Sequence, residues 1–315
     1  MRQVNRRDVL LASLRMAVGL PSAALLAACG RDGPPPGDAA PEPTQTATAA
    51  EPTPTPPPFI IPAGEERRLL MADTPQETPL YIFASGQPGP VLLTLGGVHG
   101  NEPGGWLAAE RIVGQVRPAS GALLVAPRAN VLAVQSFVRT TPELGDLNRL
   151  YPGDSNGPPM ARMAAEIVAT IREFHVSLLV DMHESWAFYK NRPQNGTAYL
   201  GQTVATYPAD PGISLARAVV QNLNATLSAP WEEFFYREFP PNRLPDPTSD
   251  RPADTSGSPA AAVSGGSASS LGLPRHVPAL AVLLVEMGQQ QALERRVALH
   301  VAVHAQVMRE IGILG

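Results

Sequence analysis

Four short apolar runs recur along the chain after residue 58, most of them with glycine or proline close by. They consist of valine, leucine and alanine, with Thr94 and Ser177 as the only polar positions. Such runs are typical of strands that are buried on both faces of a parallel sheet. We therefore expect strands at Val91–Leu95, Ala122–Ala126, Val176–Val180 and Ala279–Val285, and an edge strand at Tyr81–Ala84.

The segments between or after these runs have the periodicity of helices instead. An alternation of strands and helices favours a mainly parallel sheet that is covered by helices on both faces. We therefore predict an α/β fold with a mainly parallel, mixed sheet and with helices at Trp106–Val116, Pro159–Phe174, Ser214–Leu227 and Gln289–Ile313.

Composition separates this folded part from the N-terminal part of the chain. Of the 35 prolines among 315 residues, ten fall between Pro34 and Pro58, in a stretch with little to bury. Residues 30–58 are therefore expected to form an extended, disordered tether. The folded body is expected at 59–315, interrupted by a low-complexity surface insertion at 240–274. A net charge of −4 without a basic cluster argues against nucleic acid as a partner.

Residues 1–29 have the pattern of an export signal. The paired Arg6 and Arg7 precede an apolar stretch, and Leu26–Cys29 resembles a lipoprotein box that ends the signal, which is of the twin-arginine type. We expect lipid attachment at Cys29 and a membrane-anchored protein on the outer face of the cytoplasmic membrane or in the periplasm. An ordinary signal peptide with a chance cysteine is the alternative. Arg15 and Pro21 interrupt the apolar run before it reaches the ~20 residues of a membrane span.

Three of the predicted strands end in a side chain that can bind a metal or a proton. The segments read VLLTLGGVHGNE, VSLLVDMHES and AVLLVEMG, which place His99, His183 and Glu286 at or just past the carboxyl ends. In an open α/β sheet the loops at this edge converge on one crevice. We therefore expect His183 to join His99 and Glu102 in space.

Two histidines and one carboxylate suit a catalytic zinc ion whose fourth position is left for water. Asp181 precedes His183 by two residues and therefore shares its face of the strand. A carboxylate there can hold a ligating imidazole by its second nitrogen. The alternative for HGNE alone is a glycine turn with a surface ion pair.

Four segments in this order resemble the zinc carboxypeptidase superfamily, and within it the succinylglutamate desuccinylase/aspartoacylase branch. They are GGVHGNEPGG, GDLNRLYPG, LLVDMHES and LLVEMG, and the likeness runs from about Pro79 to the C-terminus without the insertion. The resemblance implies a zinc-carboxypeptidase-like fold and one zinc ion held by His99, Glu102 and His183.

The same resemblance implies roles for four further residues. Asn148 and Arg149 match the pair that grips a substrate carboxylate, which a guanidinium can meet with two hydrogen bonds. Arg139 matches the arginine that polarises the scissile carbonyl, although its distance to Asn148 is longer than expected. Glu286 matches the general base that takes a proton from metal-activated water and returns it to the leaving amine.

The resemblance leaves the substrate open between N-acyl-amino acids and peptides with a free carboxylate. One helical segment alone follows Glu286, so we expect no β-rich domain over the pocket and a more open cleft. The substrate-binding tyrosine of the family stays unassigned among Tyr189, Tyr199, Tyr207 and Tyr236.

Three other interpretations are weaker. His300 and His304 are four residues apart on a helix, but no third ligand follows and we expect a structural role. No G-x-S-x-G segment follows a predicted strand, which argues against a serine hydrolase. A lipid-anchored binding protein without turnover is the alternative from another class, and Glu286 argues against it because a binder needs no base there.

Overall fold

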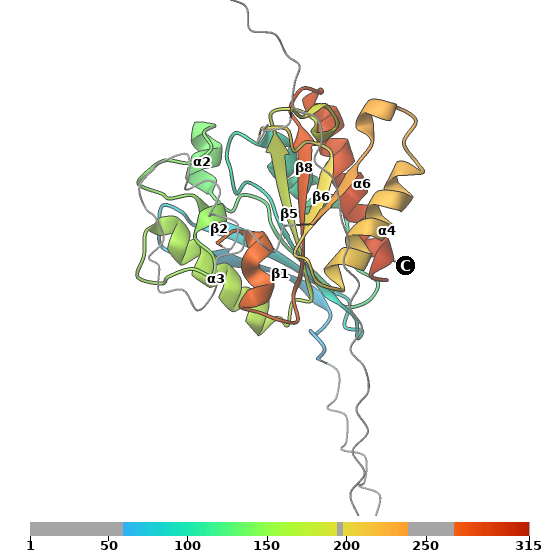
Figure 1. The fold of residues 1–315 in the computed structure, drawn as a ribbon. Coiled ribbons are helices and arrows are strands. Elements are labelled where there is room, and N and C mark those ends of the chain that lie inside the picture. The colour runs from blue at the N-terminus through green and yellow to red at the C-terminus, as the bar shows by residue number, and fades with distance from the viewer. Residues whose placement is uncertain (1–58, 194–197, 239–267, 315) are drawn as a thin grey trace, which may run out of the picture. The chain divides into compact units, whose positions relative to one another are not determined.

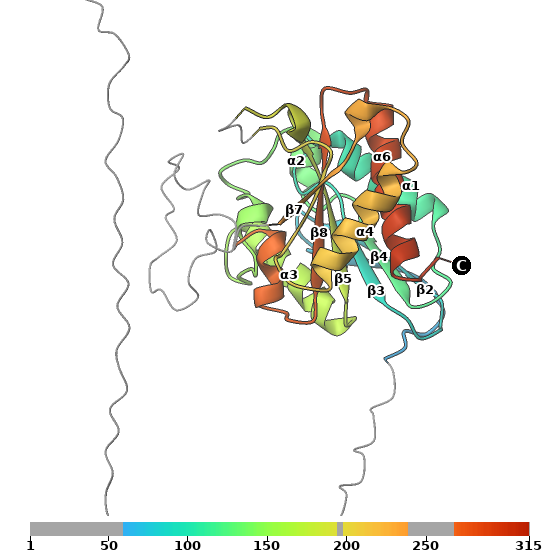
Figure 2. The same cartoon turned by 45° about the vertical axis from the view of Figure 1, so that its right-hand side comes forward.

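The computed structural model describes residues 59–193, 198–238 and 268–314, and these form one eight-stranded mixed sheet with helices on both faces (Figures 1 and 2). The strands are β1 (Gly64–Leu70), β2 (Thr78–Ala84), β3 (Val91–Leu95), β4 (Ala122–Ala126), β5 (Leu178–Ser185), β6 (Thr203–Thr206), β7 (Phe235–Glu238) and β8 (Ala281–Gly288).

The strand order is β1-β2-β4-β3-β5-β8-β6-β7. The central strands β4, β3, β5 and β8 are parallel to one another, whereas β2 runs antiparallel to β4 and β6 runs antiparallel to β8. The strand order reverses at β3, because β4 is added on one side of β3 and β5 on the other. In an open α/β sheet such a switch point opens a crevice outside the carboxyl ends of the strands.

Two apolar cores lie on the two faces of the sheet. The first packs the sheet against α3 (Pro159–Glu173) and the 3-10 helix η5 (Ser270–Arg275). The second packs it against α1 (Pro103–Gln115), α4 (Gly212–Asn224) and α6 (Leu293–Glu310). Every residue of β3 and β4 is buried, which explains why these strands lack the alternation of half-exposed ones. Burial of one leucine side chain contributes ~1.5–3 kcal/mol.

The α/β class and the mixed sheet are confirmed, with differences in the elements. The predicted β3 and β4 match the observed bounds, but β5 and β8 continue to Ser185 and Gly288, so His183 and Glu286 lie inside strands. β2 is not at the edge, because β1 pairs outside it. β1, β6 and β7 were missed, since β1 is largely exposed and the other two have only four residues each.

Part of the predicted insertion belongs to the folded body. Ser270–Arg275 form η5, whose first four residues are buried. Three other predicted segments lie outside the described residues: the export signal at 1–29, the tether at 30–58 and the part of the insertion up to residue 267. Among the helices of the described part, none has the length and apolar character needed to cross a membrane.

Candidate metal centre

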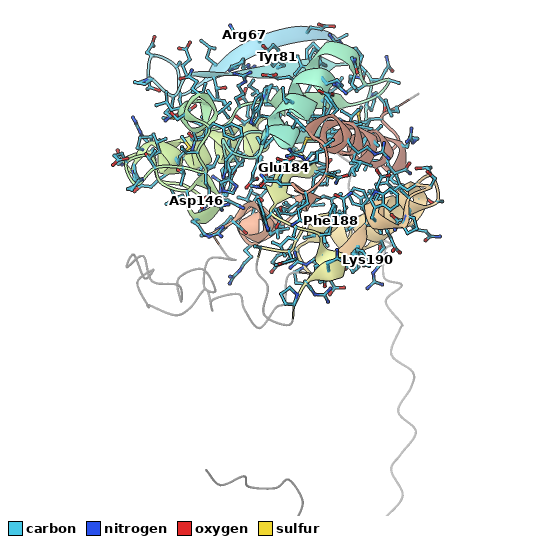
Figure 3. All side chains as sticks on the ribbon, turned by 90° about the horizontal axis from the view of Figure 1, so that it is seen from above. Arg67, Tyr81, Asp146, Glu184, Phe188 and Lys190 are labelled. Carbon is cyan, nitrogen blue, oxygen red and sulfur yellow. The ribbon has the colours of Figure 1, made fainter. Side chains whose placement is uncertain are left out.

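The predicted ligands meet at the switch point of the sheet. His99 follows β3 in a turn, Glu102 stands directly before α1, and His183 lies near the end of β5. Figure 3 looks onto this end of the molecule, with Asp146 and Glu184 labelled near its centre. Two segments, which are 81 residues apart between Glu102 and His183, are therefore brought together where parallel β3 and β5 end.

The three side chains form a compact, buried cluster. Glu102 Oε1 lies 2.7 Å from His99 Nδ1, and Glu102 Oε2 lies 2.9 Å from His183 Nδ1. The two Nδ1 atoms are 3.1 Å apart. One ligand atom from each residue lies within 4.8 Å of the others, and all three residues are buried. This arrangement matches the predicted set and has the donor types that zinc prefers.

Each imidazole turns its other nitrogen towards a carboxylate. His99 Nε2 lies 3.1 Å from Asp146 Oδ1. His183 Nε2 lies 3.0 Å from Asp181 Oδ2, at ion-pair distance but without the alignment of a hydrogen bond. Carboxylates in these positions orient metal-ligating imidazoles and make them more basic. Asp181 was predicted in this role, and Asp146 was missed although it stands in the GDLNR segment.

The charges of the cluster favour a cation. Burial acts against the charged form of Glu102, but the neighbouring His99 and His183 hold its pKa well below the usual range. Burial likewise acts against protonated His183, but Asp181 and Glu102 raise its pKa well above the usual value. Three carboxylates, those of Glu102, Asp146 and Asp181, therefore surround two imidazoles in a buried space. A divalent cation compensates this excess of negative charge, so the residues present fit zinc.

The local backbone brings His99 and Glu102 into place. Gly97 has φ +64°, in the left-handed region, and a Cβ there would lie 2.9 Å from the Cα of Arg128. Glycine therefore permits the tight turn between β3 and His99. Glu102 is the N-cap residue of α1, but its side chain makes no capping hydrogen bond. It points to the two histidines instead.

Glu286 lies beside this cluster. On the parallel strands β5 and β8 it is the register partner of His183, so both side chains leave the same face of the sheet. Its Oε2 is buried and makes no hydrogen bond with the described residues. Burial raises the pKa of Glu286 to about 7, against the effect of the nearby histidines. A buried carboxyl group with such a pKa is suited to proton transfer near neutral pH.

The structure brings Arg139 into the cluster. Its guanidinium lies 3.4 Å from Glu102 Oε1 and 3.1 Å from Asp146 Oδ2, and its side chain is 45% exposed. Arg139 is therefore positioned at the boundary between the buried ligands and solvent.

Asn148 and Arg149 lie next to the same cluster in the short helix η1 (Leu147–Arg149). Asn148 is buried, and its Oδ1 accepts a hydrogen bond of 3.0 Å from the backbone of Ser270. This bond fixes the orientation of the amide and leaves Nδ2 to donate. Arg149 is exposed. Burial acts to raise the pKa of Asp146, but the contact with His99 and the charges of Arg139 and Arg149 hold that pKa well below its usual range.

One further residue near the site, Arg237, was missed because β7 was not predicted. Arg237 is half-buried on β7, and burial lowers its pKa, whereas the nearby Tyr189 and Glu286 oppose that effect. The guanidinium of Arg237 lies 5.3 Å from the ring centre of Tyr189, which also packs against Phe235. Tyr189 is thus the one of the four candidate tyrosines for which the structure gives a link to Glu286. The aromatic run FYRE was the available sequence signal for β7.

His300 and His304 are buried on α6 and are not part of the cluster, as predicted. His304 Nε2 lies 2.9 Å from Thr94 Oγ1 of β3.

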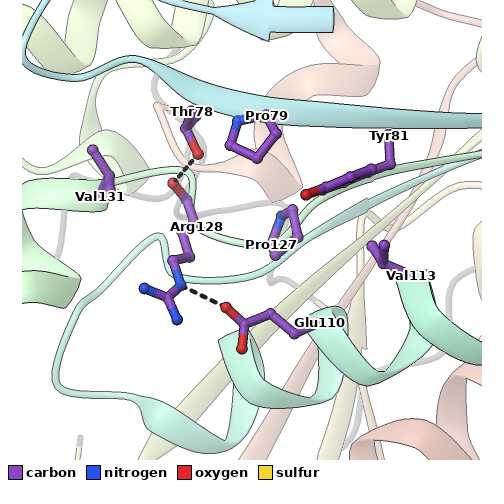
Figure 4. A pocket seen from close by; sticks show the side chains of 8 residues that line it. All are labelled: Thr78, Pro79, Tyr81, Glu110, Val113, Pro127, Arg128 and Val131. Carbon is purple, nitrogen blue, oxygen red and sulfur yellow. Dashed lines mark hydrogen bonds and ion pairs between the residues drawn. The ribbon is translucent and has the colours of Figure 1, made fainter. Parts of the chain in front are cut away.

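A pocket of about 420 Å³ lies between β2, α1 and the loop after β4 (Figure 4), and none of its lining residues belongs to the metal cluster. Arg128 and Glu110 in this pocket already form an ion pair of 2.6 Å.

Comparison with known proteins supports the same family. Residues 88–195 match the succinylglutamate desuccinylase/aspartoacylase catalytic domain. The N-alpha-acetyl-L-2,4-diaminobutyric acid deacetylase of Halomonas elongata is 33% identical over 89 residues, which are 27% of this chain and 26% of that protein. The predicted resemblance is thus confirmed over the part that contains His99, Glu102 and His183, whereas Glu286 lies beyond the matched residues.

Solved structures share the fold. Apo Csd4 of Helicobacter pylori, a cell shape determinant, has a TM-score of 0.57 at 18% identity, over 71% of this chain and 51% of Csd4. A succinylglutamate desuccinylase/aspartoacylase of Rhodobacter sphaeroides has a TM-score of 0.53 at 21% identity, over 80% of this chain and 65% of its own. The chain therefore spans about half the length of Csd4 and about a quarter of the deacetylase.

Proposed function

We propose that this chain is a zinc-dependent hydrolase that cleaves an amide bond in a substrate with a free carboxylate. The observation that carries the proposal is the pairing of His183, in the metal cluster, with Glu286, a buried carboxyl group on the adjacent strand. A metal site with a proton acceptor beside it is the arrangement that hydrolysis by activated water requires.

The residues that would hold zinc are His99, Glu102 and His183. When bound, zinc supplies a positive charge that acidifies water and polarises a carbonyl group. Asp146 and Asp181 keep the two imidazoles oriented from behind. The cluster of two histidines and one glutamate, with a carboxylate behind each imidazole, supports one ion per chain.

Glu286 would move the proton. Its Oε2 has no hydrogen-bond partner among the described residues and can therefore accept a proton from water and return it to the leaving amine. Arg139, next to Glu102, would stabilise the negative charge that develops on the scissile carbonyl.

Arg149 and the free Nδ2 of Asn148 would bind the substrate carboxylate and so align the amide bond. Arg237 adds a second cation on the β7 side of Glu286. A substrate with a carboxylate at its reactive end suits this distribution of charge. Two substrate classes agree with it, N-acyl-amino acids and short peptides.

Both classes have support among the similar proteins. The Halomonas relative is named a deacetylase, and Csd4 is described as a D,L-carboxypeptidase. The test is to assay the zinc-loaded protein on N-acetyl and N-succinyl amino acids and on tripeptides with a free C-terminus. Hydrolysis of either class supports the proposal. A protein that contains one zinc ion per chain and hydrolyses neither class would favour the alternative, a binding protein with this pocket.

Glu286→Gln separates an enzyme from a binding protein. The substitution keeps the size of the side chain but removes the proton acceptor, so an enzyme should lose at least about 100-fold in kcat, as expected when a general base is removed. Zinc content and ligand affinity should stay at the wild-type level. The zinc content of both proteins should be measured by elemental analysis before the kinetics.

The location of the protein is a separate proposal that depends on residues 1–29. Arg6, Arg7 and Leu26–Cys29 support export through a twin-arginine signal and anchoring by a lipid on Cys29. Replacement of both arginines by lysine should keep the protein in the cytoplasm. Cys29→Ser should release it from the membrane fraction, and a variant that stays membrane-bound would contradict the lipid anchor.

A further inference from the structure

Glu184 of β5 contacts two neighbouring parts of the chain. Its backbone contacts Glu102, and its side chain lies against the start of α1. Its backbone N–H donates a hydrogen bond of 2.9 Å to Glu102 Oε2, the same oxygen that faces His183. Because successive side chains of a strand point to opposite faces, the Glu184 side chain leaves β5 on the face away from the metal cluster. The residue thus connects the ligand cluster with the helices behind the sheet.

On that far face the Glu184 carboxylate is fully buried and paired. Oε2 lies 2.5 Å from Nη1 of Arg296 on α6, whose side chain is 11% exposed. Arg296 also donates through Nε to the backbone oxygen of Gln291 at 3.2 Å. Each residue of such a buried charged pair needs the other, since one buried charge left alone costs several kcal/mol of folding stability.

The other oxygen of Glu184 faces the start of α1. A Cβ on Gly104, two residues after Glu102, would lie 2.1 Å from Glu184 Oε1. The first turn of α1 can therefore approach the carboxylate only because this position is glycine. Oε1 has no hydrogen-bond partner among the described residues, but it lies against the positive end of the helix, which favours a nearby negative charge.

Gln289 ties the same elements together. It follows β8, the strand of Glu286, and its Nε2 donates to the backbone oxygen of Asn101 at 2.9 Å and lies 3.5 Å from Glu184 Oε2. Its backbone N–H donates to Ser185 at 2.8 Å. The loop of His99 and Glu102, the end of β5 and the end of β8 thus meet around one buried carboxylate.

We propose that the Glu184–Arg296 pair is a positioning unit that fixes the Glu102 carboxylate and thereby sets the affinity of the site for its metal ion. The inference rests on the metal site of the proposed function. Glu184 and Arg296 touch neither substrate nor metal, and they act by holding the first turn of α1 and β5 at the spacing that Glu102 needs.

The test compares the zinc affinity of the full chain in four variants, measured by competition with a chelator. Glu184→Gln and Arg296→Met each break the pair, and the double variant removes both charges in case a lone buried charge prevents folding. Arg295→Met is the matched control. Arg295 is the neighbour of Arg296 on α6, and the substitution breaks its ion pair of 2.5 Å with Glu232, which lies in the separate segment Pro230–Glu232. The contacts of Glu232 in the described part of the chain are with Arg295, Ala229 and Gln202, outside the loop of His99 and Glu102.

We expect zinc to bind about 10-fold or more weakly to the variants of the pair, as when other residues behind metal ligands are replaced. The visible spectrum of bound Co²⁺ should change in the same variants, because Glu102 moves relative to the histidines. Arg295→Met should keep the wild-type affinity and spectrum within about 2-fold. The double variant should lose less than the sum of the single losses, since the two residues act as one unit.

The results distinguish this inference from the proposed function. Wild-type zinc binding with unchanged affinity in Glu184→Gln and in the double variant overturns the inference alone. An equal loss in Arg295→Met also overturns it, because the effect then follows from general destabilisation. A wild-type protein that binds no divalent cation overturns both the inference and the metal site.

Discussion

His183 and Glu286 are register partners on neighbouring parallel strands, and their contacts differ. Nδ1 of His183 lies close to Glu102 and His99, whereas Oε2 of Glu286 is buried and has no hydrogen-bond partner among the described residues. The strand pairing therefore places a buried carboxyl group beside a residue of the candidate metal cluster, although the two residues are far apart in sequence.

The rate should fall with decreasing pH as Glu286 becomes protonated. Burial raises the pKa of Glu286 to about 7, and the carboxylate that acts as base is the form present above that pKa. A bound cation favours the carboxylate, so the acidic limb of the kcat/KM profile should have its midpoint at or below about pH 7. A profile measured from pH 5 to 9 tests this, and an acidic limb centred above pH 8 would contradict it.

Replacing a metal ligand should abolish metal binding without unfolding the chain. We expect His183→Gln to contain no zinc after gel filtration, and its activity should be absent. His304→Gln is the control, because His304 is a buried histidine on α6 whose side chain contacts Thr94 of β3 instead of the cluster. It should retain one zinc ion per chain, and elemental analysis of both variants provides the comparison. Equal zinc content in the two would show that the metal lies elsewhere.

Two glycines of α1 should respond in opposite directions to substitution by alanine. A Cβ on Gly104 would collide with the Glu184 carboxylate, whereas Gly114 on the same helix has no atom within 4 Å. Gly104→Ala should destabilise the protein by about 1–3 kcal/mol, the usual cost of overpacking. Gly114→Ala should stabilise it by up to about 1 kcal/mol through helix propensity. Urea denaturation of the zinc-free proteins measures both, and a stabilised Gly104→Ala would refute the close approach of α1 to β5.

Stability should fall in acid because of buried histidines on α6. Burial lowers the pKa of His304, and of His300, to about 3, whereas an unfolded histidine titrates near pH 6.5. Between these values the unfolded state binds more protons, so each histidine removes up to about 1.4 kcal/mol per pH unit as the pH decreases.

His304→Gln tests this pH dependence, since glutamine can still bond to Thr94. The free energy of unfolding of the variant should decrease less steeply between pH 6 and 4 than that of the wild type. Urea denaturation at several pH values gives both slopes. Equal slopes would mean that His304 is protonated in the folded protein.

Arg149 and Arg139 should affect different kinetic constants. Arg149 is exposed, and its guanidinium donates through Nη1 to the backbone oxygen of Asn148 at 2.7 Å, which leaves other N–H groups for a substrate carboxylate. Arg149→Met should therefore mainly raise KM, by about 10- to 100-fold for a charged hydrogen bond. Arg139 contacts Glu102 and Asp146, and Arg139→Met should mainly lower kcat. Steady-state kinetics on the same substrate separate the two effects. A pure KM effect in both variants would place Arg139 among the residues that bind the substrate.

Much of the site could be predicted because its parts stand at the ends of apolar runs. Buried parallel strands have a strong sequence signal, and β3 and β4 were predicted with their observed bounds. His99, Glu102 and His183 follow such runs, and the geometry of an open sheet brings their carboxyl ends to one crevice. Asp181 could be placed by the alternation of side chains along β5.

The residues that were missed lie where local sequence carries little information. β7 has four residues and none of them is fully buried, so Arg237 and Tyr189 had no predicted element to link them to Glu286. Asp146 stands in a loop, and its contact with His99 depends on the packing of segments 47 residues apart.

The sequence by itself determined the fold class, the residues of the candidate metal cluster and the candidate base, because apolar runs and chemical groups are properties of local segments. Tertiary structure alone decided that Asp146 stands behind His99 and that Glu184 holds the start of α1 through Arg296. These contacts join segments from different parts of the sheet, and their distances are set by how strands and helices pack rather than by any spacing along the chain.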